Sequence, residues 1–387
     1  MGLVGPGFVA AHHLDAVRRL GFVDVVALAG ADEARARAKA EALGIPKAYG
    51  SFEALAADPA IDVIHNTAPN ALHGAIVRAA LAHGKHIVSE KPLAGSAEEA
   101  LALWRLAREA GVVHAVTFNY RGNPMVEQAR SLVAAGEIGA PHFACGAYLQ
   151  DWLLKPTDFS WRLEPEKGGR SSAVADIGSH WCDLVQYVTG RQIESVLADL
   201  ATVVPTRYRP RDGRETFSAG DRRGDPVRIQ VEDLATILLR FEGGMKGTVS
   251  IGQVCAGHKN DCWFEVCGAA GSVRWQQERQ NELWIGRRDA PNQVLTKDPA
   301  LLSGPARRQA RLPGGHQQGW SDALFNVLAD VYAAIVDPGA AGRDAAAYPT
   351  FEDGYRAACL VDAVLDSHRR GGAWTAPARA ELAGSVR

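Results

Sequence analysis

Three polar residues of this chain have the types and positions that acid–base chemistry needs. Lys91 lies at the end of a strand-like run, residues 85–92, and Pro92 restricts it to an extended backbone. Asp176 and His180 are four residues apart, so a helix places both side chains on one face. Neutral histidine accepts a proton, a carboxylate orients such a ring or binds a hydroxyl, and an ammonium stabilises negative charge on oxygen. These residues together predict proton removal from a hydroxyl group.

Each of these residues also has a plainer interpretation. Lys91 can be a surface lysine before a helix-starting proline, Asp176 a helix cap, and His180 a packed histidine. We favour chemistry because the motifs occur together, and we expect the Lys91–Pro92 peptide to be cis. His180 with Asp183 or with the cysteines lacks a recognisable ligand set, so no metal site is expected.

A glycine-rich turn near the start of the chain has the pattern of a dinucleotide site. Residues 5–10, GPGFVA, form G-x-G-x-x-A between a strand-like and a helix-like stretch. In this pattern Gly5 permits the tight turn, Gly7 lets the backbone approach a pyrophosphate, and Ala10 allows close packing of helix and strand. The helix N-terminus then offers N–H groups to the phosphates. A plain tight turn is the alternative, but the surrounding βαβ pattern favours a cofactor.

The position that should select between NAD and NADP is uninformative. The fingerprint expects an acid at the end of the second strand, and Gly30 followed by Ala31 stands there. Asp32 is the nearest acid, and we expect it to cap the following helix. No basic residue is present for a 2′-phosphate, so NAD is favoured while NADP stays possible.

Length and composition limit the class of protein. With 387 residues, 47% of them apolar, the chain is long enough for two domains and is not disordered. A net charge of -2 does not suit a nucleic-acid partner, and no apolar run approaches the roughly 20 residues of a membrane helix. The N-terminal residues lack the basic region of a signal peptide, and the six cysteines form no C-x-x-C pair. We therefore expect a reduced, cytoplasmic protein.

The first 122 residues alternate strand-like and helix-like stretches. Five strands are predicted, at residues 1–5, 23–30, 61–67, 85–92 and 112–121. Repeated βα units with right-handed crossovers predict a parallel sheet with helices on both faces, the doubly wound α/β Rossmann arrangement. The first strand has only about four residues before the glycines, so either it is short or residues that precede it are missing.

The pattern changes after residue 122. Helices are predicted at residues 124–139, near 176–189 and at 351–371. Strand-like runs occur at residues 142–152, 193–204, 232–241, 245–254, 263–275 and 281–286. They predict an α+β domain over residues 123–387 with a large open, mainly antiparallel sheet, while residues 205–230 and 287–319 are expected to be loops. An open sheet usually buries its uncovered face against a partner, so a homodimer or homotetramer is expected.

Four motifs together resemble the glucose–fructose oxidoreductase / inositol dehydrogenase (Gfo/Idh/MocA) family. They are P-N-A-L-H (69–73), S-E-K-P (89–92), F-N-Y-R (118–121) and D-I-G-S-H (176–180). The resemblance covers nearly the whole chain and implies a Rossmann domain followed by an open-sheet domain. It also implies hydride transfer between a nicotinamide cofactor and a secondary carbinol of a sugar, glycoside or cyclitol. Ala68, where the family usually has Thr, and the missing acid depart from the family pattern.

The resemblance assigns expected roles to individual residues. Lys91, Asp176 and His180 are expected to be catalytic, with His180 taking the hydroxyl proton and Lys91 stabilising the alkoxide. Residues expected to bind the cofactor are Gly5, Gly7, Phe8, Val9, Gly30, Pro69, Asn70, His73, Glu90, Lys91, Asn119, Trp161 and Arg162. Residues expected to bind substrate are Lys91, Tyr120, Arg121, Tyr148, Gln150, Asp151, Trp152, Asp176 and His180. Core packing is an equal interpretation of Trp152 and Trp161.

A narrower likeness concerns Y-L-Q-D-W (148–152) and S-W-R (160–162). These motifs resemble the branch that contains levoglucosan dehydrogenase and other hexopyranoside and cyclitol dehydrogenases. Two other functions stay open: a glycosidase that uses the cofactor for oxidation and elimination, and a regulator that binds a dinucleotide without turnover. The sequence leaves open the sugar, the carbon that is oxidised and the direction of the reaction.

Overall fold

The computed structural model describes residues 1–210, 224–337 and 347–379. These residues form two compact units: the first joins Met1–Asn119 with Leu324–Ala358, and the second joins Tyr120–Ala323 with Cys359–Ala378. The chain therefore returns to the first unit after building most of the second. The single division at residue 122 that the sequence suggests stays a prediction.

The first unit contains a six-stranded parallel sheet with the strand order β3-β2-β1-β4-β5-β6. Its strands are β1 Gly2–Val4, β2 Ala27–Ala29, β3 Lys47–Tyr49, β4 Val63–Asn66, β5 His86–Ser89 and β6 His114–Val116. β1, β2 and β4 are buried along their whole length, as strands covered on both faces are. Because the strands are parallel, the turns that follow β1, β4 and β5 lie at one edge of the sheet.

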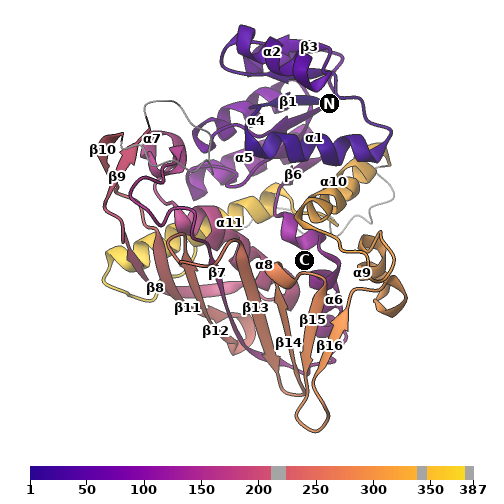
Figure 1. Ribbon diagram of the computed structural model, residues 1–387, viewed down its shortest axis with the longest axis vertical. Helices are drawn as coiled ribbons and strands as arrows, with labels where there is room; N and C mark the ends of the chain where they lie inside the picture. The colour runs from indigo at the N-terminus through magenta and orange to yellow at the C-terminus, as the bar shows by residue number, and fades with distance from the viewer. Residues whose placement is uncertain (211–223, 338–346, 380–387) are drawn as a thin grey trace. The chain divides into compact units, whose positions relative to one another are not determined.

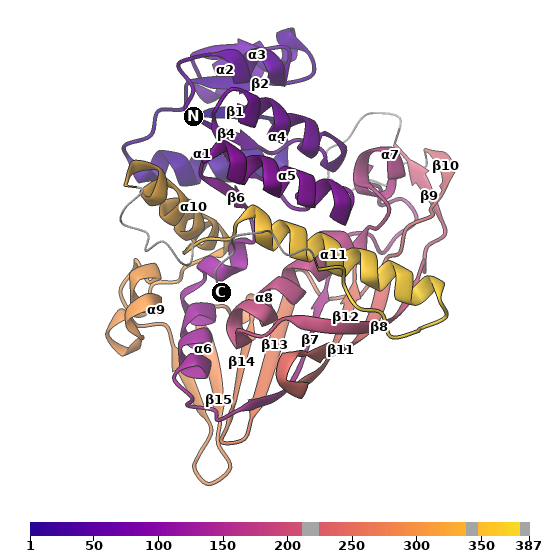
Figure 2. The ribbon, with the colours of Figure 1, turned by 180° about the vertical axis from the view of Figure 1, so that it is seen from behind.

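Helices cover both faces of this parallel sheet. α1 Phe8–Leu20 lies in front of the sheet in Figure 1, whereas α4 His73–Ala82 and α5 Ala97–Ala110 lie in front of it in Figure 2. α2 Glu33–Leu43 and α3 Phe52–Ala57 complete the alternation of strands and helices. The side chain of Ser96 caps α5 by accepting from the backbone N–H of Glu99, in agreement with a helix that begins there.

The second unit contains an eight-stranded sheet in which only one neighbouring pair, β7 with β12, is parallel. Its order is β16-β15-β14-β13-β7-β12-β11-β8. The strands are β7 Pro141–Leu149, β8 Ile193–Ala201, β11 Leu234–Phe241, β12 Lys246–Gly252, β13 Asp261–Gly268, β14 Ser272–Gln276, β15 Glu282–Gly286 and β16 Gln293–Thr296. A separate ribbon pairs β9 Thr206–Arg209 with β10 Asp225–Arg228. The predicted fold class is confirmed in both parts.

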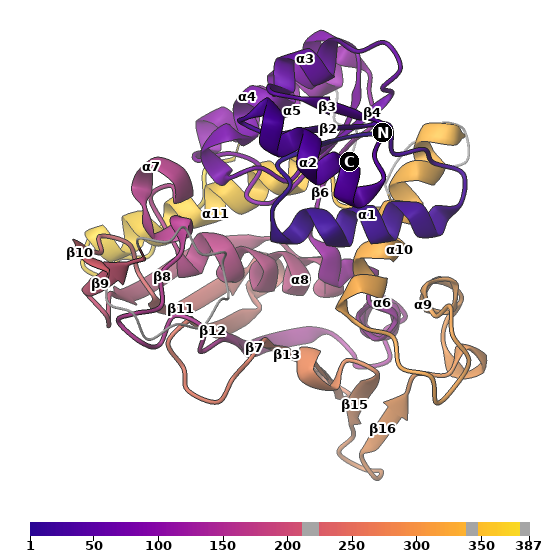
Figure 3. The same ribbon diagram turned by 45° about the horizontal axis from the view of Figure 1, so that its top comes forward.

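The long helices of the second unit lie on one face of its sheet. α6 Pro124–Ala134 and α8 Ser179–Thr189 pack there, as Figure 3 shows for α8, and their apolar residues join the core of the sheet. Along β11 buried and exposed residues alternate, so Ile237 faces the core and Leu238 faces away from it. The opposite face of the sheet is thus left without a layer of helices among the described residues.

Several elements were not predicted from the sequence. β3 has three residues with exposed or half-buried side chains at a sheet edge, too short for a periodic signal. The predicted loop 287–319 contains β16 and α9 Gly304–Gln309, and the predicted loop 205–230 contains β9 and β10, with its residues 211–223 outside the described part. α10 Trp320–Val336 was missed, whereas α11 Phe351–Arg369 was predicted. None of the described helices is both long enough and apolar enough to cross a membrane.

Candidate active site

The glycine turn after β1 has the geometry of an anion-binding turn. Gly5 has φ +87°, and a Cβ there would lie 2.5 Å from Cα of Ala68, so only glycine fits. Gly7 precedes α1 and faces open space, and no side chain caps this helix. The hydroxyl of Thr67 donates to the carbonyl oxygens of Val4 and Gly5, at 2.9 and 2.7 Å, which ties the turn to the end of β4. The start of α1 is therefore held in a position from which its backbone N–H groups can donate to phosphate oxygens.

The end of β2 offers no side chain to the cofactor. Gly30 is half-buried and its N–H donates to the carbonyl of Tyr49 at 3.1 Å. Asp32 caps α2, accepting from the N–H of Arg35 at 2.8 Å, which confirms the helix-capping prediction. A carboxylate that binds a ribose hydroxyl is thus missing from its usual place.

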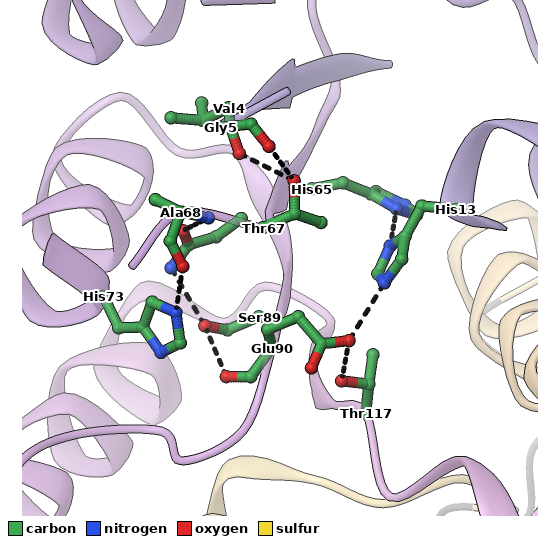
Figure 4. A network of polar contacts seen from close by, with 11 residues as sticks. Val4, Gly5, His13, His65, Thr67, Ala68, His73, Ser89, Glu90 and Thr117 are labelled. Atoms are coloured by element: carbon green, nitrogen blue, oxygen red, sulfur yellow. Dashed lines mark hydrogen bonds and ion pairs between the residues drawn. The ribbon is translucent and has the colours of Figure 1, made fainter. Parts of the chain in front are cut away.

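The turns after β4 and β5 are joined by a buried histidine, His73, whose contact with Ala68 is drawn in Figure 4. Nδ1 of His73 lies 2.7 Å from the carbonyl oxygen of Pro92, and its Nε2 lies 2.9 Å from that of Ala68. Burial lowers the pKa of His73. The Lys91–Pro92 peptide between β5 and this contact is cis, which confirms the prediction, and Lys91 itself is half-buried.

Glu90, next to Lys91, ends a chain of buried polar groups (Figure 4). Its Oε1 accepts from the hydroxyl of Thr117 at 2.6 Å and lies 3.1 Å from Nε2 of His13. Nδ1 of His13 lies 2.9 Å from Nδ1 of His65, whose Nε2 lies 3.0 Å from the hydroxyl of Tyr332. Burial opposes ionisation of Glu90, but His13, Lys91 and Thr117 outweigh it and lower its pKa to about 2.

Other residues predicted to bind the cofactor lie at the same turns of the first unit. Phe8 and Val9 begin α1, and Pro69 and Asn70 begin a short 3₁₀ turn, Asn70–Leu72, before α4. Asn119 is 3% exposed and its Nδ2 has no hydrogen-bond partner among the described residues. A buried amide donor without a partner is costly unless a ligand satisfies it. This donor and the open helix N-terminus fit a nicotinamide dinucleotide.

In the second unit, Asp176 is held by Gln253 and Arg162. It lies in a π-helical turn, Val174–Gly178, directly before α8, a wider turn than the α-helix its spacing to His180 suggested. Its Oδ2 accepts from Nε2 of Gln253 at 2.9 Å, and its Oδ1 lies 3.3 Å from Nε of Arg162. The carboxylate of Asp176 therefore has a fixed orientation.

A buried carboxylate fixes the start of the segment that carries Asp176. Oε1 of Glu232 accepts from the hydroxyl of Ser171 at 2.6 Å and from the N–H groups of Ser172 and Val174, at 3.0 and 2.9 Å. Burial raises the pKa of Glu232 although these three donors oppose the shift. Glu232 thus caps the start of the π-helical turn, because the residue at the N-cap position of that turn makes no side-chain cap.

His180 lies among aromatic residues that carry hydroxyl groups. Its ring centroid is 5.2 Å from that of Tyr120 and 6.5 Å from that of Tyr148. The two tyrosine hydroxyls are 2.6 Å apart, and that of Tyr148 also donates to Oδ1 of Asn260 at 2.6 Å. Burial raises the pKa of both tyrosines, so both hydroxyls stay protonated. Tyr120, Tyr148 and His180 are therefore brought together.

The segment after β7 continues this polar cluster. Nε2 of Gln150 donates to Oδ1 of Asn260 at 3.0 Å, and Nε1 of Trp152 donates to Oε1 of Gln150 at 2.8 Å. Trp152 also packs on the small apolar cluster around Leu153. Asp151 differs: its carboxylate accepts from Nζ of Lys259 at 2.6 Å, and this hydrogen bond lowers its pKa.

Arg121 and Trp161 have partners of their own. Arg121 binds both carboxylate oxygens of the buried Asp183, and its guanidinium lies 4.8 Å from the ring centroid of Tyr187. Such a bidentate pair is a scaffold contact, which argues against Arg121 as a substrate ligand. Trp161 begins a 3₁₀ turn, Trp161–Leu163, and stacks under the guanidinium of Arg162 at 4.6 Å.

Sequence reasoning missed the residues that support these side chains. Gln253, Glu232 and Asn260 lie in turns without a motif, and each reaches its partner across more than fifty positions of the chain. Only His13 had a signal, because it follows the glycine turn within α1. In the part of the chain that the structure describes, no group of three or more His, Cys, Asp or Glu side chains is arranged to hold a metal ion.

Comparison with known proteins identifies both parts of the chain. Residues 1–118 match the model of an oxidoreductase family with an NAD-binding Rossmann fold, and residues 126–274 match that of the GFO/IDH/MocA C-terminal domain. The chain belongs to the Gfo/Idh/MocA oxidoreductase family. It is an NAD(P)-dependent oxidoreductase whose first part is the NAD-binding Rossmann fold, as the sequence motifs predicted.

Relatives within the family include sugar and cyclitol dehydrogenases. Levoglucosan dehydrogenase of Pseudarthrobacter phenanthrenivorans is 31% identical over 95% of each chain. A solved structure of levoglucosan dehydrogenase with NADH and L-sorbose is 29% identical, with a TM-score of 0.86 over 97% of this chain and 98% of that one. An inositol dehydrogenase homolog from Azotobacter vinelandii, in complex with NAD⁺, is 27% identical, with a TM-score of 0.85 over 97% of this chain and 96% of that one.

Proposed function

We propose that this Gfo/Idh/MocA protein is a dehydrogenase that transfers a hydride between NAD(P) and a secondary carbinol of a sugar, glycoside or cyclitol. The observation that carries this proposal is the cluster around His180, in which an imidazole lies against two protonated tyrosine hydroxyls linked to two amides. Such a set of donors and acceptors suits a ligand that presents several hydroxyl groups. Levoglucosan dehydrogenase, a relative of this chain, is named for a compound of this kind.

The cofactor would be held by residues of the first unit. The N–H groups at the start of α1 would bind the pyrophosphate beside Gly7, and the buried amide of Asn119 would donate to the nicotinamide end. His73 and Glu90 would keep the turns after β4 and β5 in place around it. When bound, the nicotinamide supplies the hydride acceptor or donor.

The chain's own residues would handle the proton and the charge. His180 takes the proton of the substrate hydroxyl, which must leave as the carbon–hydrogen bond breaks. Lys91 stabilises the negative charge that develops on that oxygen. Asp176, oriented by Gln253 and Arg162, accepts a hydrogen bond from a neighbouring substrate hydroxyl. Gln150 and Trp152 contribute an amide and an aromatic wall for the sugar ring.

The proposal is tested with a panel of sugars, glycosides and inositols. Each compound is incubated with the protein and NAD⁺ or NADP⁺, and reduced cofactor is followed by its absorbance while free sugar is assayed in parallel. Substrate-dependent cofactor reduction supports the dehydrogenase. Release of sugar without net reduction supports oxidation and elimination instead. Tight binding of NADH with no turnover on any compound supports a regulator and contradicts the proposal.

The uncovered sheet face is proposed to bind a second copy of the chain. One row of paired residues crosses this face, running through Leu238, Thr248, Cys145, Glu265, Arg274, Trp284 and Val294. Leu238 is 44% and Val294 59% exposed, which is unfavourable for apolar side chains of a lone subunit. We therefore expect the protein to form a homodimer or homotetramer. Sedimentation of the protein and of Leu238→Glu tests this, and a wild-type monomer contradicts it.

The proposed compartment is the reducing cytoplasm. All six cysteines are free thiols, and three of them, Cys182, Cys262 and Cys359, are buried. Free cysteines in this number are typical of proteins that stay in a reducing environment. Localisation of a tagged protein by cell fractionation tests the proposal.

A further inference from the structure

A continuous hydrogen-bond chain leads through the first unit to Glu90, and the proposed reaction does not use it. The chain runs from Tyr332 on α10 through His65 on β4 and His13 on α1 to the carboxylate beside Lys91. Both imidazoles are 0% exposed. Buried histidines that contact each other are expensive unless every ring nitrogen has a partner, and here each of the four nitrogens has one.

The donors and acceptors of this chain have only one consistent direction when both histidines are uncharged. The carboxylate of Glu90 only accepts, so Nε2 of His13 carries the proton. Nδ1 of His13 is then an acceptor, and Nδ1 of His65 must donate to it across 2.9 Å. Nε2 of His65 is in turn an acceptor, so the hydroxyl of Tyr332 donates. Every donor in the chain therefore points toward Glu90.

We propose that His13 and His65 are positioning residues for the turn after β5, which carries Glu90 and Lys91. Through this hydrogen-bond chain the two histidines hold the carboxylate of Glu90 in one orientation beside Lys91. The inference rests on the proposed role of Lys91 as the group that stabilises the alkoxide. A fixed carboxylate in the adjacent residue limits the conformations of the turn after β5 and so fixes where the ammonium lies.

The groups around this chain favour the same state. Burial holds the pKa of His65 well below its usual value, so its ring is neutral. Glu90 faces His13 from α1, Thr117 after β6, Lys91 in its own turn and His73 from α4. Of these, His13, Lys91 and Thr117 stabilise the carboxylate form, and the pKa of Glu90 falls to about 2. Glu90 is thus a permanent acceptor.

Two amide variants of His13 separate positioning from packing. Gln places its amide nitrogen near the position of Nε2, so His13→Gln keeps a donor for Glu90, whereas the shorter Asn of His13→Asn reaches only toward His65. We expect His13→Asn to lower kcat about 10-fold or more and His13→Gln to stay within about 3-fold of the wild type, with the KM for the sugar unchanged. His12→Asn, in the neighbouring position, is the matched control.

The pH profile gives a second readout of the same variants. In His13→Asn the carboxylate has lost a donor, so the pKa of Glu90 rises, and protonation of Glu90 adds a second fall of kcat on the acid side, below the limb that protonation of the base His180 produces. His13→Gln and His12→Asn should keep the wild-type limb. Equal losses of kcat in His13→Gln and His13→Asn, or no loss in either, overturn the proposal. Either result would mean that a donor to Glu90 at this position does not affect turnover.

Tautomers measured by NMR test the chain without any turnover. In protein labelled with ¹⁵N-histidine at mildly alkaline pH, we expect His65 as the Nδ1–H form and His13 as the Nε2–H form. Tyr332→Phe removes the last donor but leaves the acceptor on Nδ1 of His13, so His65 should keep the Nδ1–H form. Wild-type His65 in the Nε2–H form overturns the proposal. If the tautomers are as expected but Lys91→Ala is fully active, the hydrogen-bond chain stands and the proposed function fails, so the two failures are distinguishable.

Discussion

Replacing Glu232 tests whether a buried cap positions the segment that carries Asp176. In Glu232→Ala one hydroxyl and two backbone N–H groups lose their common acceptor in a buried environment. Each unsatisfied donor costs about 1–3 kcal/mol, and partial relaxation leaves a loss of about 2–5 kcal/mol in the free energy of unfolding. Glu232→Gln keeps a carbonyl oxygen at the same place, so it should retain most of this stability.

The two variants also differ in their dependence on pH. Because burial raises the pKa of Glu232 in the folded state, the wild type is stabilised by this group at acid pH and loses that contribution as the pH rises through the folded pKa. Glu232→Gln lacks the titration, so its stability relative to the wild type should increase from acid to neutral pH.

Urea unfolding followed by tryptophan fluorescence measures both effects. Glu166→Ala, at an exposed position of α7 Pro165–Gly168, is the control and should lie within about 0.5 kcal/mol of the wild type. Glu232→Ala should also lose about 10-fold or more in kcat, because Asp176 is no longer held in place. A Glu232→Ala protein as stable and as active as the control refutes the capping account.

Three further variants test individual parts of the site. Gly5→Ala should lower the thermal midpoint and the affinity for NADH, because its Cβ meets Ala68 at 2.5 Å, whereas Gly7→Ala should weaken NADH binding about 10-fold with an unchanged midpoint. Calorimetry and fluorescence titration check both, and an unstable Gly7→Ala contradicts the assignment. Gly30→Asp should raise the NAD-to-NADP affinity ratio about 10-fold. An unchanged ratio contradicts the assignment of the end of β2 as the place where a carboxylate would bind the ribose hydroxyl. Tyr148→Phe removes the donor to Asn260 and should raise the KM for the sugar a few-fold more than it lowers kcat, in steady-state assays.

The fold was predictable because its signals are local. Strands and helices are indicated by the period of their apolar residues, and helix ends by glycines with positive φ and by caps such as Ser96 with Glu99. Each of these signals lies within a few residues, and together they predict both sheets. The elements that were missed, β3 and α10, lack such a signal: β3 is three residues at an edge, and α10 lies outside the repeating βα units. Membership of α10 in the first unit depends on tertiary contacts such as that of Tyr332 with His65, 267 residues away.

The site was predictable only where it carried motifs. Lys91, Asp176 and His180 belong to short patterns that can be recognised in the sequence. Their supports cannot, because an acceptor for Ser172 or an orienting amide for Asp176 can come from any part of the chain. Glu232 lies 60 residues from Ser172, and Asn260 lies 112 residues from Tyr148. Arg121 shows the converse, since only the structure reveals that its charge is paired with Asp183.

The shared role of Lys91 and His180 in one hydride transfer is tested most directly by the kinetics of Lys91→Ala, His180→Ala and the double variant on the best compound of the sugar panel. If one supplies positive charge and the other removes the proton in the same step, each single variant should lose about 10²-fold or more in kcat, and the double variant should lose far less than the product of the two. Full turnover in both single variants contradicts the account, as do losses that multiply independently.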